Sequence, residues 1–371
     1  MENKLYEKEL NAISKSNRTR SRKLFNKDLK DLASNDYLGL AQNKSLLRKT
    51  YKKLKKESCF SPKASILVNG YSNIHNKFEK KLCKANGFED GIVVGNGFLA
   101  NISLIESLVR KGDILFIDEE YHASGILATK LLNPSQVILF PHNNFKDLEN
   151  KLKNNQNNGR VIIAIEGVYS MNGNLAKKEF FDLADNYNAL LIVDEAHSSG
   201  VIGDNLLGIY DFYNIKIKDN HIKMGTLGKA YGSYGAYILA SKNIIKFLEN
   251  RAKPIIYSTA PSLFDIALAN ESLNYILKNK EKLKQKIKQN LNIIKSYLGI
   301  ESNSLIIPID INDNKKVITI QEELKKSNFL VGAIRQPTVK RAILRLIAKI
   351  DIKKKDLIEV CKQIKEFNAD K

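Results

Sequence analysis

Short apolar runs alternate with amphipathic segments along the middle of this chain, from about residue 41 to residue 255. Runs such as VIIAIEGV (161–168) and LLIVDEAH (190–197) are rich in branched side chains, which is typical of strands buried on both faces. The other runs of this kind are GIVVGNGF (91–98), DILFID (113–118), QVILF (136–140), HIKMGT (221–226) and GAYILA (235–240). The alternation predicts βαβ units and therefore an α/β fold with a mainly parallel sheet.

The two ends of the chain differ from this middle part. Residues 1 to about 40 are basic and helix-prone and end in a turn at ASNDYLGL (33–40). After residue 262, long lysine-rich helical patterns precede short apolar runs, which are SLIIPIDI (304–311), FLVGAIR (329–335) and AILRLIA (342–348). We therefore expect an N-terminal helical segment over 1–40, a large domain over 41–255 and a smaller α+β domain over 262–371.

The charge of the chain is strongly positive, with 60 Lys and Arg against 40 Asp and Glu, a net charge of +20. This excess raises the hypothesis of a nucleic-acid-binding protein. However, the lysines of 278–288 alternate with Glu and Gln, and Leu277, Leu283 and Ile287 have helical spacing, so the stretch indicates a solvated helix face. Since no nucleic-acid motif accompanies the charge, we expect no nucleic-acid partner. An acidic substrate carrier is another partner that this charge would attract.

Several classes of protein are excluded by what the chain lacks. No apolar run approaches the roughly 18 residues of a membrane span, and the N-terminus has no apolar signal core. Cys59, Cys83 and Cys361 are scattered and form no CxxC pair, and no HExxH-like cluster is present. We therefore expect a protein of the reducing cytoplasm with no membrane span, no disulfide framework and no metal site.

Candidate functional residues follow the predicted strands. Asp194 ends the apolar run LLIVD, His197 follows it closely, and Lys229 lies among glycines in MGTLGKAYG (224–232). Open α/β sheets bind their ligands at the carboxyl ends of strands. Pyridoxal phosphate needs a lysine that binds its aldehyde and a carboxylate that keeps its ring nitrogen protonated. Together these segments predict a pyridoxal-phosphate site.

The sequence D-E-A-H after an apolar strand is also found in helicase-type NTPases. Such an enzyme needs a phosphate loop of the form GxxxxGK[ST], normally before the acidic strand. The nearby stretch GTLGKA (225–230) follows the acidic strand, has the wrong spacing and lacks the Ser or Thr that would hold magnesium. The NTPase interpretation is therefore set aside.

Further candidates lie after other predicted strands. Gly97 and Phe98 precede a helical pattern, and a helix N-terminus there would offer free N–H groups to a phosphate, which Thr226 could also reach. His122 follows the run DILFID and could stack on a heteroaromatic ring. Ser170 follows VIIAIEGV. Each of these residues also has an ordinary interpretation as part of a turn or a helix cap.

A cluster of basic residues lies in GAIRQPTVKRAILRLIA (332–348). An arginine fork is the natural bidentate receptor for a substrate carboxylate. Arg345 stands in an alternating strand pattern, where a polar side chain among apolar neighbours requires a partner. That partner is either a substrate carboxylate or an acidic residue of the same lobe.

These motifs, in their order and spacing, resemble the α-oxoamine synthase family of fold-type I pyridoxal-phosphate enzymes. The resemblance extends from about Arg20 to the C-terminus. It rests on SNDYLGL (34–40), VNGYSNIH (68–75), GNGFLAN (95–101), DEEYHAS (118–124), EGVYSMNGN (166–174), VDEAHSSGVIG (193–203), TLGKAYGSYGA (226–236), IYSTAPS (256–262) and AIRQPT (333–338). An aminotransferase of the same fold type matches NDYLGL and AIRQPT less well.

The resemblance implies roles around the cofactor ring. Lys229 would bind the cofactor covalently, Asp194 would pair with the ring nitrogen, and His122 would stack on the ring. His197 and Ser170 would approach the phenolic oxygen of the ring.

The resemblance also implies roles for the phosphate and the amino acid. Thr226 and the backbone of Gly97 and Phe98 would hold the phosphate. Asn35 and Arg345 would receive the carboxylate of the amino-acid substrate, although the segment from Thr338 to Arg345 is about two residues shorter than in the family.

For the rest of the substrate, the resemblance points to Arg20 and Thr338, with Arg18 and Arg22 as alternatives to Arg20. The stretch SPKAS (61–65) replaces a glycine-rich stretch of relatives near the substrate entrance. We therefore expect this loop to affect the choice of acyl chain.

The implied activity is the decarboxylating condensation of an amino acid with an acyl thioester, in a homodimer. Within the family, the resemblance is greatest to members of biotin biosynthesis that use L-alanine and a pimeloyl thioester of coenzyme A or acyl carrier protein. Glycine C-acetyltransferase and other acyl-thioester condensing members remain alternatives.

Overall fold

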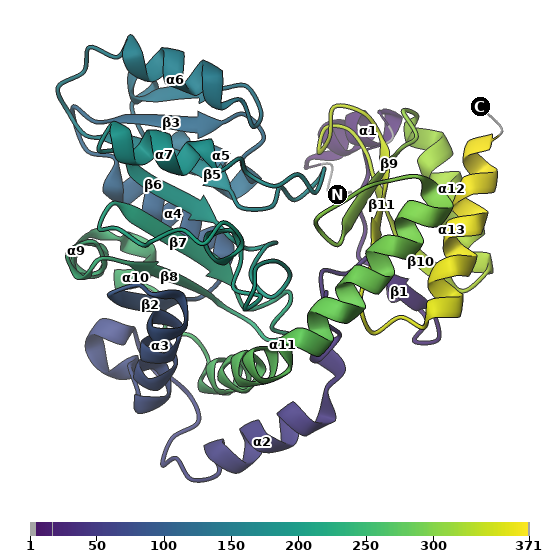
Figure 1. The fold of residues 1–371 in the computed structure, drawn as a ribbon, viewed down its shortest axis with the longest axis horizontal. Helices are drawn as coiled ribbons and strands as arrows, with labels where there is room; N and C mark the ends of the chain where they lie inside the picture. Colours follow the sequence, from purple (N-terminus) through teal and green to yellow (C-terminus); the bar gives the residue numbers. More distant parts are fainter. Residues whose placement is uncertain (1–4, 17, 370–371) are drawn as a thin grey trace.

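The computed structural model describes residues 5–16 and 18–369 of the chain. Its larger sheet has seven strands in the order β2-β8-β7-β6-β5-β3-β4 (Figure 1). The strands are β2 (Asp90–Val94), β3 (Ile114–Asp118), β4 (Val137–Phe140), β5 (Val161–Glu166), β6 (Leu190–Asp194), β7 (His221–Thr226) and β8 (Ala236–Ala240). Strand β8 is antiparallel to both of its neighbours, and the five strands from β7 to β4 are parallel. The predicted α/β fold with a mainly parallel sheet is confirmed.

Both faces of this sheet are buried, which explains why its strands are apolar at successive positions. Along β5, Ile162 and Ala164 belong to one hydrophobic core, and Ile163 and Ile165 belong to another. Helices follow the strands along the chain. They are α3 (Asn73–Asn86), α4 (Gly97–Leu108), α5 (Ala123–Thr129), α6 (Phe145–Lys153), α7 (Glu179–Asn186), α8 (Ile209–Phe212), α9 (Lys242–Arg251) and α10 (Lys253–Ile256).

A second sheet of four strands has the order β1-β10-β11-β9. It contains β1 (Lys30–Leu32), β9 (Ile306–Asp310), β10 (Phe329–Ile334) and β11 (Ile343–Ile347), and α12 (Asn314–Lys326) and α13 (Lys354–Ala369) belong to the same part of the chain. Strands β9 to β11 form where the apolar runs predict them. Strand β1 lies in the segment predicted to be helix-prone, because three residues are too few to show a strand period.

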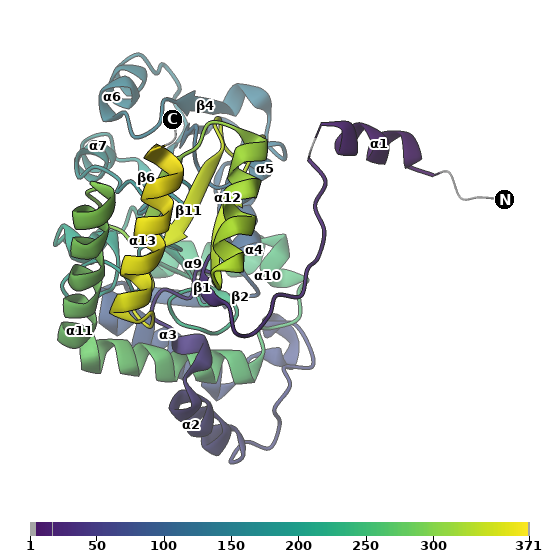
Figure 2. The same cartoon turned by 90° about the vertical axis from the view of Figure 1, so that its right-hand side faces the viewer.

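Strand β1 pairs in parallel with β10, so the start of the chain is part of a sheet whose other strands lie near its end. Helix α1 (Glu7–Lys15), in contrast, has no buried residue and stands away from the rest of the molecule (Figure 2). Residues 1–4, 17 and 370–371 of the predicted ranges lie outside the described part of the chain. The proposed domain boundaries remain predictions.

The two sheets are linked by α11 (Leu263–Leu298), a helix of 36 residues. It packs against α2 (Lys44–Leu54) and α3 and also against α13 (Figure 1). No helix within residues 5–16 and 18–369 is long and apolar enough to cross a membrane.

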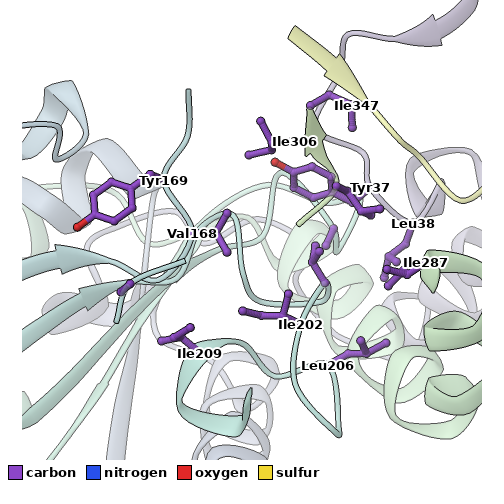
Figure 3. Packing of buried hydrophobic residues seen from close by; sticks show 14 of the residues in the cluster. Tyr37, Leu38, Val168, Tyr169, Ile202, Leu206, Ile209, Ile287, Ile306 and Ile347 are labelled. Carbon is purple, nitrogen blue, oxygen red and sulfur yellow. The ribbon is translucent and has the colours of Figure 1, made fainter. Parts of the chain in front are cut away.

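The loop after β1 packs between the two sheets. Tyr37 and Leu38 are buried in the same hydrophobic cluster as Ile306 and Ile347 of the smaller sheet and Ile202, which follows β6 (Figure 3). This packing fixes the loop beside the carboxyl ends of the strands of the large sheet, where the candidate residues lie.

Candidate active site

Two acidic side chains end neighbouring strands of the large sheet. Glu166 of β5 and Asp194 of β6 are paired in register, and both are buried. Thr226 ends the next strand, β7, and Lys229 follows it. The parallel arrangement therefore brings these residues to one sheet edge.

The carboxylate of Asp194 is held by two N–H donors. Asn101 of α4 donates from Nδ2 to Oδ2 at 2.9 Å, and the backbone N–H of Ala196 donates to Oδ1 at 2.9 Å. The same Asn101 amide donates to Ser124 Oγ, which lies 2.7 Å from His122 Nδ1. Asp194 and His122 are therefore fixed by one buried network.

The imidazole of His122 caps the N-terminus of α5 by accepting the N–H of Ser124. Burial lowers the pKa of His122, and the nearby Lys229 cation lowers it further, whereas Asp194 opposes the shift. A neutral imidazole is consistent with the predicted stacking role, which remains a prediction.

A second network begins at Lys229. Its Nζ lies 2.7 Å from His197 Nε2, and His197 Nδ1 lies 2.5 Å from the hydroxyl of Tyr37. That hydroxyl is 3.3 Å from Asn35 Oδ1, which accepts from Arg345 Nη1 at 3.1 Å. The structure thus joins the residues predicted for cofactor and amino acid through Tyr37.

Burial lowers the pKa of Lys229 to about 8, with a smaller contribution from Arg345, while Asp194 and Glu166 oppose the shift. Burial and the Lys229 cation also hold the pKa of His197 well below its ordinary value. At neutral pH the site therefore combines a neutral imidazole with an amine that loses its proton easily.

Two buried polar atoms of this region, Glu166 Oε1 and Arg345 Nη2, have no hydrogen-bond partner among the described residues. Other atoms of these side chains have partners. The N–H of Ser170 donates to Glu166 Oε2, the carbonyl of Ser170 accepts from Arg345 Nε, and Arg345 Nη1 donates to Asn35. Burial, followed by the Asp194 charge, raises the pKa of Glu166 well above its ordinary value. Orphaned groups of this kind fit a bound polar ligand.

The N-terminus of α4 provides a place for a phosphate. The Asn96 side chain caps the helix at Leu99, and the N–H groups of Gly97 and Phe98 have no helical acceptor. A Cβ on Gly97 would meet only Thr226 Cβ, at 3.9 Å, so the space in front of this turn is open. The lysine, the strand-end carboxylate and this cradle fit pyridoxal phosphate.

Arg20 and Thr338 also come together, with Arg20 Nη2 donating to Thr338 Oγ1 at 3.1 Å. Both are exposed and line a cavity of about 320 Å³ with Arg18 and Arg335. They differ in this from the buried residues above, and their predicted contact with substrate remains a prediction. Arg22 is exposed and does not line this cavity.

Three residues of the site had no predicted role: Tyr37, Asn101 and Glu166. A signal was present for Glu166, because it ends the run VIIAIE just as Asp194 ends LLIVD. Tyr37 and Asn101 lie inside the motifs SNDYLGL and GNGFLAN, but their partners are far away in the sequence. Within the described residues, no group of three or more His, Cys, Asp or Glu side chains could hold a metal ion.

Comparison with known proteins gives a consistent result. A model of the aminotransferase class I and II family matches residues 27–364. The chain is 44% identical to an 8-amino-7-oxononanoate synthase of Helicobacter pylori strain J99 over 98% of both chains. It is 38% identical to a putative 8-amino-7-oxononanoate synthase of Aquifex aeolicus over 95% of both.

Solved structures share the fold. An 8-amino-7-oxononanoate synthase from Francisella tularensis superposes with a TM-score of 0.76 at 26% identity, covering 93% of this chain and 99% of that one. A serine palmitoyltransferase from S. paucimobilis, in a complex containing pyridoxal phosphate, superposes with a TM-score of 0.87 at 21% identity, covering 98% of both.

Proposed function

The chain belongs to the aminotransferase class I and II family, and on this premise we propose that it is a pyridoxal-phosphate-dependent acyltransferase of biotin biosynthesis. It condenses L-alanine with a pimeloyl thioester and releases CO₂ and the thiol carrier, giving 8-amino-7-oxononanoate. The observation that carries the proposal is the similarity to 8-amino-7-oxononanoate synthases over nearly the whole chain. The fold is that of fold-type I enzymes, as predicted.

When bound, pyridoxal phosphate supplies an electron-poor ring that stabilises negative charge at the Cα atom of the amino acid. The carboxylate of Asp194, held by Asn101 and the N–H of Ala196, offers an acceptor for the ring N–H. Thr226 and the first N–H groups of α4, those of Gly97 and Phe98, would hold the phosphate. His122 would cover the ring, and His197 and Ser170 would approach its phenolic oxygen.

Lys229 carries the proton chemistry. Because burial lowers its pKa to about 8, its Nζ can take up the Cα proton and later return a proton to the same carbon. The Arg345 guanidinium, with one N–H group unpartnered, and Asn35 receive the carboxylate of alanine. Arg20 and Thr338 contact the substrate at the exposed side.

The choice of acyl chain is proposed to depend on the loop Ser61–Ser65. Backbone contacts fix this loop, because Ala64 accepts the N–H of Ala260 and Ser65 Oγ donates to the carbonyl of Ile256. Exposed apolar residues flank the loop, Phe60 on one side and Leu67 and Val68 on the other. A pimeloyl chain is largely apolar, and these side chains offer it a surface.

The active form is proposed to be a homodimer in the cytoplasm. Phe98, at the phosphate cradle, is 44% exposed, and Tyr234 and Tyr257 are 56% and 81% exposed. A second copy covering these aromatic rings would exclude water from the site. Light scattering of the purified protein during size-exclusion chromatography measures this state.

Product analysis tests the proposed reaction. The purified, cofactor-loaded protein is incubated with alanine or glycine and with the pimeloyl, acetyl or succinyl thioester, on coenzyme A and, for pimeloyl, also on acyl carrier protein. We expect 8-amino-7-oxononanoate from alanine and pimeloyl thioester as the main product by mass spectrometry. A preference for glycine with acetyl-CoA would contradict the proposal and favour glycine C-acetyltransferase.

A further inference from the structure

Tyr37 occupies a special position, because one hydroxyl group faces both halves of the site. Its oxygen lies 2.5 Å from His197 Nδ1 and 3.3 Å from Asn35 Oδ1. The side chain is 1% exposed, so no bulk water replaces either contact. The hydroxyl has a single proton and can donate to only one of these two atoms at a time, while its oxygen can accept from the other side.

Lys229, which lies on the Nε2 side of His197, has two protonation states, an ammonium group and a neutral amine. His197 Nε2 lies 2.7 Å from Lys229 Nζ. An ammonium group has only donors, so it requires a bare Nε2, and the neutral imidazole then carries its proton on Nδ1. A neutral amine has a lone pair, which a proton on Nε2 would satisfy, and Nδ1 is then bare.

Only a group that both donates and accepts can satisfy Nδ1 in both cases. With Lys229 as ammonium, His197 Nδ1–H donates to the Tyr37 oxygen, and the Tyr37 hydroxyl donates to Asn35. With Lys229 as amine, the Tyr37 hydroxyl turns and donates to His197 Nδ1. Between the two arrangements the N–H bond at Nδ1 of His197 breaks and an N–H bond at Nε2 forms. Imidazole and hydroxyl hold one proton each in both arrangements, so the net change is the one proton lost by Lys229, which leaves to solvent or substrate.

We propose that Tyr37 is a positioning residue that lets His197 change its tautomer when Lys229 changes its protonation state. The tautomer that accompanies the free amine presents an N–H group at Nε2, on the side where the ring oxygen of the cofactor is proposed to lie. Lys229 therefore becomes a neutral amine in the same step in which the N–H group of His197 changes from Nδ1 to Nε2. The inference rests on the proposed site, but not on the choice of substrates.

Other charges act on these three residues. Asp194, Glu166 and Arg345 act on Lys229, while Arg345 and His122 act on His197. The charges acting on Tyr37 are those of Arg345 and Glu166, and Arg345 also donates a hydrogen bond to the Tyr37 hydroxyl, whose oxygen has room for more than one donor. Since Glu166 is itself titratable, Glu166→Gln serves as a control, and the tautomer change should persist in it.

Nitrogen NMR of the apoprotein tests the tautomers directly. The chain has five histidines, and ring-labelled His197 is assigned by the signal missing in His197→Gln. In the wild type we expect a neutral ring with its proton on Nδ1 near pH 6 and on Nε2 near pH 10, changing near about pH 8, where Lys229 titrates. A single tautomer throughout this range would overturn the proposal.

Tyr37→Phe removes the hydroxyl and keeps the ring. We expect it to abolish the tautomer change and to shift the pH midpoint for capture of pyridoxal phosphate by Lys229 downward by about 0.5–1 pH unit, because an unsatisfied buried N–H disfavours the ammonium arrangement. The midpoint is measured from the visible absorbance of the loaded protein. A midpoint and a tautomer change equal to those of the wild type would contradict the proposal.

A matched control is Tyr210→Phe, which also removes a buried hydroxyl, one that donates to the carbonyl of Ile222 at 3.4 Å. We expect the pH midpoint for cofactor capture in Tyr210→Phe to equal that of the wild type.

In turnover, Tyr37→Phe should lower kcat while KM for alanine changes less than about twofold, because Arg345 still contacts Asn35. An increase of KM alone, with an unchanged pH midpoint, would indicate a purely structural role for Tyr37 and would overturn the proposal. Failure of product formation in the wild type, with the tautomer change present, would instead contradict only the proposed reaction.

Discussion

Two groups of lysine and acidic side chains lie near each other in this fold, and only one of them, which contains Lys229, Asp194 and Glu166, belongs to the candidate active site. Lys223 and Glu195 are 1% and 0% exposed, with Nζ 3.4 Å from Oε1. Asp194 is the direct neighbour of Glu195 in the sequence, and Lys229 lies in the loop that follows the strand of Lys223.

The two groups differ in how their hydrogen bonds are completed. Glu195 accepts from Ser198 Oγ and from the backbone N–H groups of Ile209 and Tyr210, and Lys223 also donates to the carbonyl of Leu207. In the other group, Glu166 Oε1 and Arg345 Nη2 have no partner. A buried group whose polar atoms all have hydrogen-bond partners is part of the folded structure. A group with unpartnered polar atoms can still bind a ligand.

Lys229→Ala should have the largest effect and should separate the two groups most clearly. We expect kcat to fall by at least about 10⁴-fold, as for loss of an activated catalytic side chain, and the visible absorbance of bound cofactor to disappear. The urea midpoint of the apoprotein should stay within experimental error of the wild type. A yellow variant with wild-type activity would contradict the assignment of Lys229.

Glu195→Gln should produce the opposite pattern. Removing one charge leaves the Lys223 ammonium buried without a counter-ion, which should lower the free energy of unfolding by about 3 kcal/mol. Urea unfolding followed by circular dichroism measures this change, and activity per folded molecule should remain. Full stability with lost activity would place Glu195 in the functional group instead.

Glu166→Gln should change the pH dependence of stability. Burial raises the pKa of Glu166 in the folded chain, so the stability that this carboxyl contributes is present below its ordinary pKa and is lost as pH rises through the raised value. The variant cannot lose that proton, and its urea midpoint should therefore decline less than that of the wild type between about pH 5 and pH 9. Identical pH profiles would show that Glu166 is not protonated in the folded chain.

Arg20→Ala should have the smallest effect. Because Arg20 is exposed and contacts Thr338 at the surface, stability should change by less than about 0.5 kcal/mol. We expect KM for the acyl thioester to increase severalfold with little change in kcat. Arg22→Ala is the matched control, since Arg22 is equally exposed but lies outside the cavity that Arg20 lines. Equal KM values for both variants would remove Arg20 from the substrate site.

The sequence predicts the fold well because the large sheet is buried on both faces. Most of its strands are apolar runs, although β7 also contains His221 and Lys223, and the register of β5 and β6 follows once the runs are aligned. Strand β1 is not predicted from the sequence, because three residues are too few to show a strand pattern and they form a strand by pairing with β10. The strand-end position of Asp194 and the glycines around Lys229 are local signals and are found in the same way.

The hydrogen-bond networks of the site cannot be predicted from local sequence patterns. The hydroxyl of Tyr37 and the ring of His197 are 160 residues apart in the chain, and no periodic pattern connects them. Nor does the sequence distinguish Glu166 from Glu195, since both are acidic residues at the end of an apolar strand. The two residues differ in their hydrogen bonds in the structure, because both oxygens of Glu195 have partners and Glu166 Oε1 has none among the described residues.

The pairing of β1 with β10 has a consequence for how the protein is made on the ribosome. Asn35 and Arg345 are 310 residues apart, so at about 5–20 residues per second roughly 15–60 s of synthesis separate the two partners. All strands of the large sheet, with Asp194 and Lys229, are synthesised within this interval. The proposed receptor for the amino-acid carboxylate is incomplete until Arg345 has emerged, so the residues proposed to hold the cofactor are made before the receptor for the substrate is complete.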